Sequence, residues 1–131
     1  MGSKGEENMK LNIILLLGYC GFIFMLSHQP SLPAPMLFLH QDKLIHATAY
    51  AIMALLAWRV FLNTNQSRYM VALISILFCS LYGVSDEFHQ SFIDGRDADV
   101  WDWLADTIGA SLMVFVLMWF PKLQSQVKKR V

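Results

Sequence analysis

Four long apolar runs limit the folds that this 131-residue chain can adopt. They cover residues 11–26, 45–62, 69–84 and 103–120, and with flanking residues each approaches the roughly 20 residues that a helix needs to cross a bilayer. A single strand cannot satisfy its backbone hydrogen bonds in lipid, so helices are expected. Only 15% of the residues are charged, whereas about a quarter is usual in soluble domains. The sequence therefore predicts an all-α integral membrane protein with four transmembrane helices in one bundle.

The domain organisation is expected to be simple. The polar segment MGSKGEEN, residues 1–8, precedes a second methionine, Met9, and is interpreted as a cloning scar. Residues 9–131 then form a single domain. Cys20 and Cys79 lie within apolar runs and are predicted to be core residues. The net charge is zero, so nucleic acid is not expected as a partner.

The distribution of lysine and arginine predicts the orientation of the bundle. With the N-terminus inside, the outer loops hold two cations, Lys43 and Arg96, and the inner segments hold seven. The inner set is Lys10, Arg59, Arg68, Lys122, Lys128, Lys129 and Arg130. Both termini are therefore predicted to be cytoplasmic. Trp58 and Trp119 are then expected near the inner membrane interface, and Trp101 and Trp103 near the outer one, where aromatic belts occur.

Acidic residues gather at the predicted outer end. After residue 8 the chain has eight of them: Asp42, Asp86, Glu87, Asp94, Asp97, Asp99, Asp102 and Asp106. All four histidines are expected at the same end. Ionisable groups at membrane depth normally face the bundle interior or a wet cavity. Two cations for eight acids leave a negative surplus that protons, a metal ion or a cationic ligand group could offset. The pattern predicts a polar site at the extracytoplasmic mouth.

Helical spacing places several residues of this predicted site on shared helix faces. One stripe of residues four apart holds Asp42, His46 and Tyr50, and a second holds Asp86 and Gln90 beside Glu87. The third consists of Asp99, Asp102 and Asp106. Two other interpretations stay open: Asp97 or Asp99 is equally suited to cap the last helix, and the polar residues together could form a purely structural network.

Two motifs carry a family resemblance, DKLIHATAY (residues 42–50) and DEFHQSFIDGRDADVWDWLADTIG (residues 86–109). They resemble the VanZ-like family, whose pattern is an Asp-Lys-x-x-His-x-x-x-Tyr helix, an Asp-Glu-x-x-Gln-x-Phe segment, then Gly-Arg and spaced Asp, Asp, Asn and Gly. The matching residues are Asp42, Lys43, His46, Tyr50, Asp86, Glu87, Gln90, Phe92, Gly95, Arg96, Asp99, Asp102 and Gly109. Three positions depart from the pattern: Asp94 replaces a proline, Asp106 an asparagine and Met113 a small residue.

The resemblance implies a small multi-pass protein of the bacterial plasma (inner) membrane. The family's namesake is associated with teicoplanin resistance in bacteria. A role at the cell envelope, linked to glycopeptide susceptibility and with the site facing outside, is therefore the expectation that the resemblance adds.

Three classes of function stay open. The first is an enzyme acting on a lipid-linked or peptidoglycan-related substrate, with His46 or Glu87 as general acid or base and Arg96 binding a phosphate. The second is a protein that binds an envelope ligand without turnover. The third is an ion- or proton-coupled transporter, for which four helices are few unless the chain forms a homo-oligomer.

The candidate residues are the same for all three classes. The candidate catalytic residues are His46, Asp86, Glu87 and Arg96, and the candidate substrate-binding residues are Asp42, Lys43, Tyr50, Gln90, Asp102 and Asp106. No cofactor is identified, although a divalent cation is compatible with the clustered carboxylates. Membrane lipid and a lipid-linked envelope precursor are the candidate partners.

Overall fold

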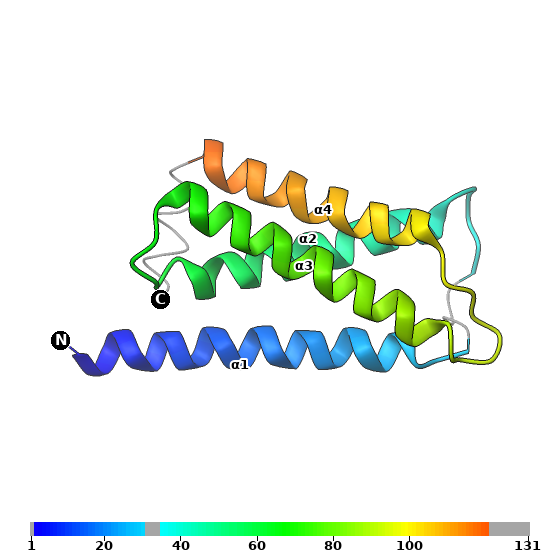
Figure 1. Cartoon of the computed structure of the whole chain (residues 1–131), viewed down its shortest axis with the longest axis horizontal. Helices are drawn as coiled ribbons and strands as arrows, with labels where there is room; N and C mark the ends of the chain where they lie inside the picture. The colour runs from blue at the N-terminus through cyan, green and yellow to red at the C-terminus, as the bar shows by residue number, and fades with distance from the viewer. Residues whose placement is uncertain (1, 31–34, 121–131) are drawn as a thin grey trace.

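Four helices make up the fold in the computed structural model, which describes residues 2–30 and 35–120 (Figure 1). They are α1 (Gly2–Ser27), α2 (Gln41–Phe61), α3 (Arg68–Gln90) and α4 (Val100–Trp119). Successive helices run in opposite directions, and the described residues contain no strand. All four are long and apolar enough to cross a membrane. The predicted all-α class with four membrane helices is therefore confirmed, and the chain is a multi-pass membrane protein.

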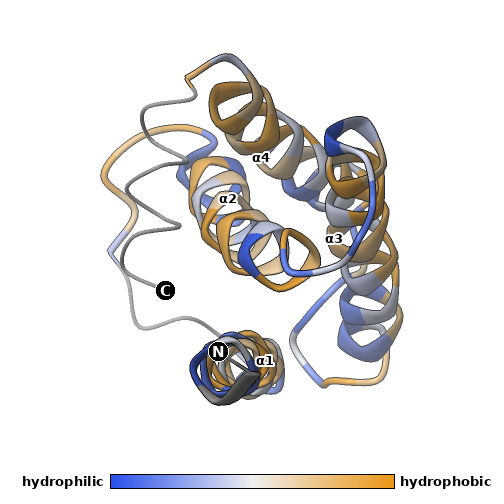
Figure 2. Ribbon diagram, turned by 90° about the vertical axis from the view of Figure 1, so that its left-hand side faces the viewer, coloured by the Kyte–Doolittle hydropathy of each residue, from blue (hydrophilic) through white to orange (hydrophobic). Residues whose placement is uncertain are grey.

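Helices α2, α3 and α4 form the centre of the bundle, and α1 lies to one side against α2 and α3 (Figure 2). The core between the three central helices includes Tyr50, Met53 and Trp58 of α2. Trp58 is fully buried in the last turn of α2, so its ring does not face lipid, and its position near the inner interface stays a prediction. Large apolar side chains such as Phe88 and Phe115 are exposed on the outside, as lipid-facing surfaces require.

Helices α2 and α4 approach each other closely where Gly109 meets the backbone of Ala47. A small residue at a membrane helix interface lets two backbones approach each other. The contact lies one turn from Asp106 on α4 and beside His46 on α2. It therefore sets the distance between the two helices that carry most of the polar residues.

Helix α1 is held by hydrogen bonds as well as by packing. The Tyr19 hydroxyl donates to the carbonyl of Ala49 on α2 at 2.8 Å, and the Tyr82 hydroxyl of α3 donates to the carbonyl of Cys20 at 2.5 Å. Cys20 and Cys79 are both buried and free, which confirms their assignment to the core. These bonds fix α1 beside the polar end of the bundle.

The end of α3, the loop after it and the start of α4 position the acidic residues of the second motif. α3 continues to Gln90, beyond its predicted apolar run, so Asp86, Glu87 and Gln90 are helical residues. Gly95 turns the connecting loop with a φ of 83°, a left-handed conformation that glycine adopts without strain. Asp99 caps α4 by accepting a hydrogen bond from the backbone N–H of Trp101 at 2.9 Å. Of the two proposed caps, Asp99 is the one used.

The orientation in the membrane stays a prediction, and four of its cations, Lys122, Lys128, Lys129 and Arg130, lie outside the described residues. Labelling of introduced cysteines in intact cells tests it. With buried Cys20 and Cys79 as a weak background, an impermeant maleimide should label Met36→Cys and leave Gln66→Cys unlabelled until the membrane is permeabilised. The reverse pattern would invert the topology.

Candidate functional site

All ten candidate residues lie at one end of the bundle, where the chain passes from α1 to α2 and from α3 to α4 (Figure 1). The structure divides them into three groups: an ion-pair network around Lys43, a cluster around His46, and the lining of a cavity beside α1. The groups touch one another but do not form one uniform site.

The first group is an ion-pair network in which Lys43 joins α2 to the start of α4. Its Nζ lies 2.8 Å from Asp42 Oδ2, 2.7 Å from Asp99 Oδ2 and 2.5 Å from Asp102 Oδ1. The hydrogen bond from Lys43 holds the pKa of Asp99 below its usual value. With three carboxylates around it, Lys43 is positioned to hold α2 against the start of α4 rather than to bind an anionic ligand.

The second group, the His46 cluster, consists of His46 of α2, Glu87 of α3 and Asp106 of α4. His46 Nδ1 lies 2.9 Å from Asp106 Oδ1. One possible ligand atom from each residue lies within 4.8 Å of the other two. Asp106 is 0% exposed and Glu87 is 8% exposed. Asp106 Oδ2 and Glu87 Oε1 are both buried without a hydrogen-bond partner among the described residues.

Glu87 is oriented by the chain around it. Its Oε2 accepts a hydrogen bond from the backbone N–H of Asp99 at 2.9 Å. This bond holds one carboxylate oxygen at the start of α4 and leaves Oε1 unpaired. Glu87 does not line the cavity that contains Asp86 and Arg96, so the predicted grouping of the four candidate catalytic residues is only partly found.

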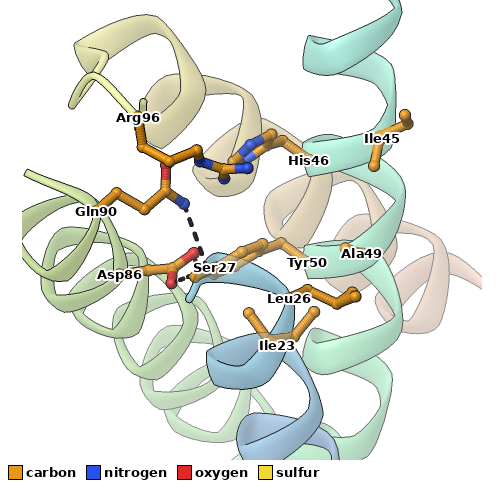
Figure 3. Close-up of a pocket in the computed structure, with 10 residues that line it drawn as sticks. All are labelled: Ile23, Leu26, Ser27, Ile45, His46, Ala49, Tyr50, Asp86, Gln90 and Arg96. Carbon is orange, nitrogen blue, oxygen red and sulfur yellow. Dashed lines mark hydrogen bonds between the residues drawn. The ribbon is translucent and has the colours of Figure 1, made fainter. Parts of the chain in front are cut away.

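The third group surrounds Asp86 of α3 (Figure 3). The Ser27 hydroxyl donates a short hydrogen bond to Asp86 Oδ1, and the Tyr50 hydroxyl lies 3.4 Å from Asp86 Oδ2. Gln90 Nε2 donates to the Ser27 hydroxyl at 3.3 Å. Asp86 is 5% exposed, so these hydroxyl donors replace the water that it would otherwise bind. The network joins α1 to α2 and α3.

Arg96 enters the site from the loop after α3, and its side chain extends over the cavity on the side of His46 (Figure 3). Among the described residues, no carboxylate lies within 4.0 Å of its guanidinium. Arg96 therefore keeps its planar donor fork available at the cavity. The sequence placed it at the site but did not indicate that it would lack an ion pair.

Two cavities meet at this end. The inner cavity, about 50 Å³, lies between α1, α2 and α3 and has apolar and polar walls. It is lined by Ile23, Leu26, Ser27, Ile45, His46, Ala49, Tyr50, Asp86, Gln90 and Arg96. The outer cavity, about 330 Å³, is lined by Met36, Gln41, Asp42, Ile45, His46, Gln90, Gly95, Arg96, Asp97 and Asp102. Because Ile45, His46, Gln90 and Arg96 line both, the two cavities adjoin.

A third hollow, the α1–α2 groove, lies beside the inner cavity between α1 and α2. It has a volume of about 370 Å³ and is lined by Tyr19, Leu44, Ile45, Thr48, Ala49 and Ile52. It shares Ile45 and Ala49 with the inner cavity. An apolar groove therefore lies beside a cavity that has several polar side chains in its wall, an arrangement suited to an amphiphilic molecule.

Sequence reasoning missed Ser27 as a site residue and left the role of Asp99 open. Ser27 is the last residue of α1 and is 4% exposed, but nothing in its sequence neighbourhood predicts contact with Asp86. Asp99 was considered as a cap or as part of an acidic stripe, and it serves in both. The spacing of Asp99 and Asp102 was the available signal.

Comparison with known proteins gives two matches. The family model described as VanZ/LLP1 matches residues 10–121. An uncharacterized protein of the fission yeast Schizosaccharomyces pombe is 29% identical over 111 residues, which are 84% of this chain and 60% of the relative. The chain thus spans about three fifths of that relative. No solved structure matches the chain.

Proposed function

Because this chain belongs to the VanZ/LLP1 family, we propose that it binds a lipid-linked, anionic compound of the cell envelope at the polar end of its bundle. The apolar part of the ligand occupies the α1–α2 groove, and its headgroup occupies the adjoining cavities. The proposal places the site on the outer side of a bacterial plasma membrane and connects it with glycopeptide susceptibility.

The observation that carries the proposal is that the three hollows share lining residues. Ile45 lines all of them, so a ligand that spans the groove and the two cavities would contact this one side chain throughout. The walls change from apolar side chains in the groove to His46, Gln90 and Arg96 at the mouth. A soluble ligand would not need an apolar groove that opens on the outside of a membrane bundle, whereas a lipid-linked ligand would.

The charge of the headgroup is inferred from Arg96. A guanidinium binds phosphate or carboxylate oxygens in a bidentate manner, and Arg96 has no carboxylate within 4.0 Å among the described residues. Lys43, the other cation of this end, is occupied by three carboxylates. Arg96 is therefore the residue to which a headgroup phosphate is assigned.

The location follows from two arguments. The excess of lysine and arginine in the segments that the sequence predicts to lie inside favours an extracytoplasmic site. The resemblance to a family whose namesake is associated with teicoplanin resistance favours an envelope ligand in a bacterium. A fungal protein is among the relatives, so the bacterial assignment depends on the resemblance alone.

A second candidate function is catalysis on the bound ligand, and the His46–Asp106 pair favours it. A carboxylate 2.9 Å from one imidazole nitrogen orients the ring and supports a general base. His46 also lines both cavities, so its ring borders the space that a headgroup would occupy. If the purified protein turned over a lipid-linked phosphate and His46→Gln abolished this turnover, the protein would be an enzyme rather than a binding protein alone.

Blocking the junction of the hollows tests the binding proposal. Ile45→Trp should reduce the amount of anionic lipid that co-purifies with the protein by about tenfold, because a larger side chain at the residue that lines all three hollows takes space from each of them. Native mass spectrometry of the protein released from detergent measures the bound lipid. The matched control is Ile108→Trp, which changes an isoleucine on the outside of α4 that is 55% exposed. Equal retention of lipid by the two variants would contradict the proposal.

A further inference from the structure

We propose that the His46 cluster binds a divalent first-row transition-metal ion, Zn²⁺ or Mn²⁺, between α2, α3 and α4. The ligands are the imidazole of His46 and the carboxylates of Glu87 and Asp106, one from each helix. This site lies outside the α1–α2 groove, although His46 also lines the two cavities, and metal binding requires no ligand in the groove or the cavities.

The geometry of the three side chains is close to that of a metal site. Ligand atoms on a tetrahedral ion lie roughly 3.4 Å apart when each bond is about 2.1 Å long. His46 Nδ1 and Asp106 Oδ1 are 2.9 Å apart, and the three candidate ligand atoms lie within 4.8 Å of one another. Side-chain movements of about an ångström would therefore bring all three to bonding distance.

The two unpaired carboxylate oxygens point independently to a cation. Buried polar atoms nearly always have a hydrogen-bond partner, because an unpaired one loses the water that it bound in the unfolded chain. Glu87 Oε1 and Asp106 Oδ2 have no partner among the described residues, although both residues are more than nine-tenths buried. A metal ion between them supplies the missing interaction for both.

The charge balance of this end also favours a divalent cation. Six carboxylates take part in the three groups: Asp42, Asp86, Glu87, Asp99, Asp102 and Asp106. The permanent cations are two, Lys43 and Arg96, so six charges against two leave a surplus of four. Lys43 contacts three of the carboxylates, and none of these belongs to the His46 cluster. An ion of charge two at the cluster would halve the surplus where the carboxylates are most buried.

The surrounding residues orient the ligands as metal sites require. The backbone N–H of Asp99 holds Glu87 Oε2 and leaves Oε1 for the ion. Asp102 Oδ2 lies 3.7 Å from His46 Nε2, which is longer than a hydrogen bond, and a small rotation of Asp102 would bring it to the position from which a carboxylate commonly orients a metal-bound imidazole. One nitrogen and two carboxylate oxygens suit zinc or manganese better than calcium or magnesium, which prefer oxygen ligands alone.

Metal titration of the full chain in detergent tests the inference. A second feature must first be removed: His28 Nδ1 lies 3.2 Å from His89 Nε2 in an exposed pair that could bind metal by itself. The background is therefore a chain in which His28, His40 and His89 are each replaced by glutamine. After treatment with a chelator, this protein should bind one Mn²⁺ or Zn²⁺ per chain by isothermal titration calorimetry, and should bind Mg²⁺ and Ca²⁺ far more weakly.

Variants then locate the ion. Glu87→Gln, Asp106→Asn and His46→Gln should each weaken binding by on the order of 100-fold or more, since each removes one ligand. Asp97→Asn, which neutralises an exposed carboxylate at the same end, should leave the affinity unchanged. Absence of binding to the background protein, or equal binding by all four variants, would overturn the inference.

A spectroscopic measurement decides the case in which the ligand variants do not fold. His46 is the one histidine left in the background protein, so pulsed EPR of bound Mn²⁺ should show coupling to a single imidazole nitrogen. Bound Mn²⁺ without nitrogen coupling would place the ion elsewhere and overturn the assignment of His46.

Discussion

Asp86→Asn and Arg96→Lys should each abolish envelope-related activity while leaving a folded, membrane-inserted protein. The same is expected of Glu87→Gln. These replacements keep the size of the side chain and most of its hydrogen bonds, but they remove a charge or the planar guanidinium fork. In cells whose glycopeptide susceptibility depends on the protein, each variant should behave as a deletion. The melting temperature in detergent, measured on the same variants, should change little or rise.

The separation of activity from stability follows from the structure. Asp86 is 5% exposed and lies in a region with surplus negative charge, so neutralising it relieves repulsion and desolvation. Arg96 has no carboxylate within 4.0 Å among the described residues, so Arg96→Lys breaks no ion pair there. Asp94→Asn, at an exposed position in the same loop, serves as the control and should alter neither property. Loss of activity in proportion to loss of stability would instead make these residues a structural network.

The sequence was sufficient to predict the helices and the end at which the polar residues gather. Separate apolar runs of this length cross lipid as helices. A spacing of four residues then places side chains such as His46 and Tyr50 on one face of a helix, whatever surrounds it. The positions of charged residues relative to the runs then put Lys43 and Asp102 at the same end. These inferences need only local geometry, and the structure agrees with them.

The division of the carboxylates among partners could not be predicted in the same way. Glu87 and Asp86 are neighbours in the sequence, yet one contacts α4 and the other contacts α1 and α2. Their partners depend on how α3 is rotated about its axis, which the packing of all four helices decides. The role of Ser27 has the same origin, because it depends on where α1 ends beside α3. Spacing along one helix contains no information about its rotation.

The close approach of α2 and α4 requires a glycine at position 109. Gly109→Ala should destabilise the protein by about 3 kcal/mol or more. The added Cβ would lie 2.0 Å from the carbonyl oxygen of Ala47, 2.6 Å from its carbonyl carbon and 2.7 Å from its Cα. These are backbone atoms that cannot rotate away, so the two helices must move apart by more than an ångström.

That movement should disturb the site as well as the bundle. The 2.9 Å contact of His46 with Asp106 and the 2.5 Å contact of Lys43 with Asp102 both join α2 to α4, and both would lengthen. The melting temperature in detergent should fall by roughly 10 °C. Gly21→Ala is the matched control, because no atom lies within 4 Å of its added Cβ, and replacing an unconstrained helical glycine should stabilise α1 by up to about 1 kcal/mol. If both alanine variants melted at the temperature of the parent protein, α2 and α4 would not approach each other as closely as this contact requires, and the distances within the His46 cluster would have to be revised with it.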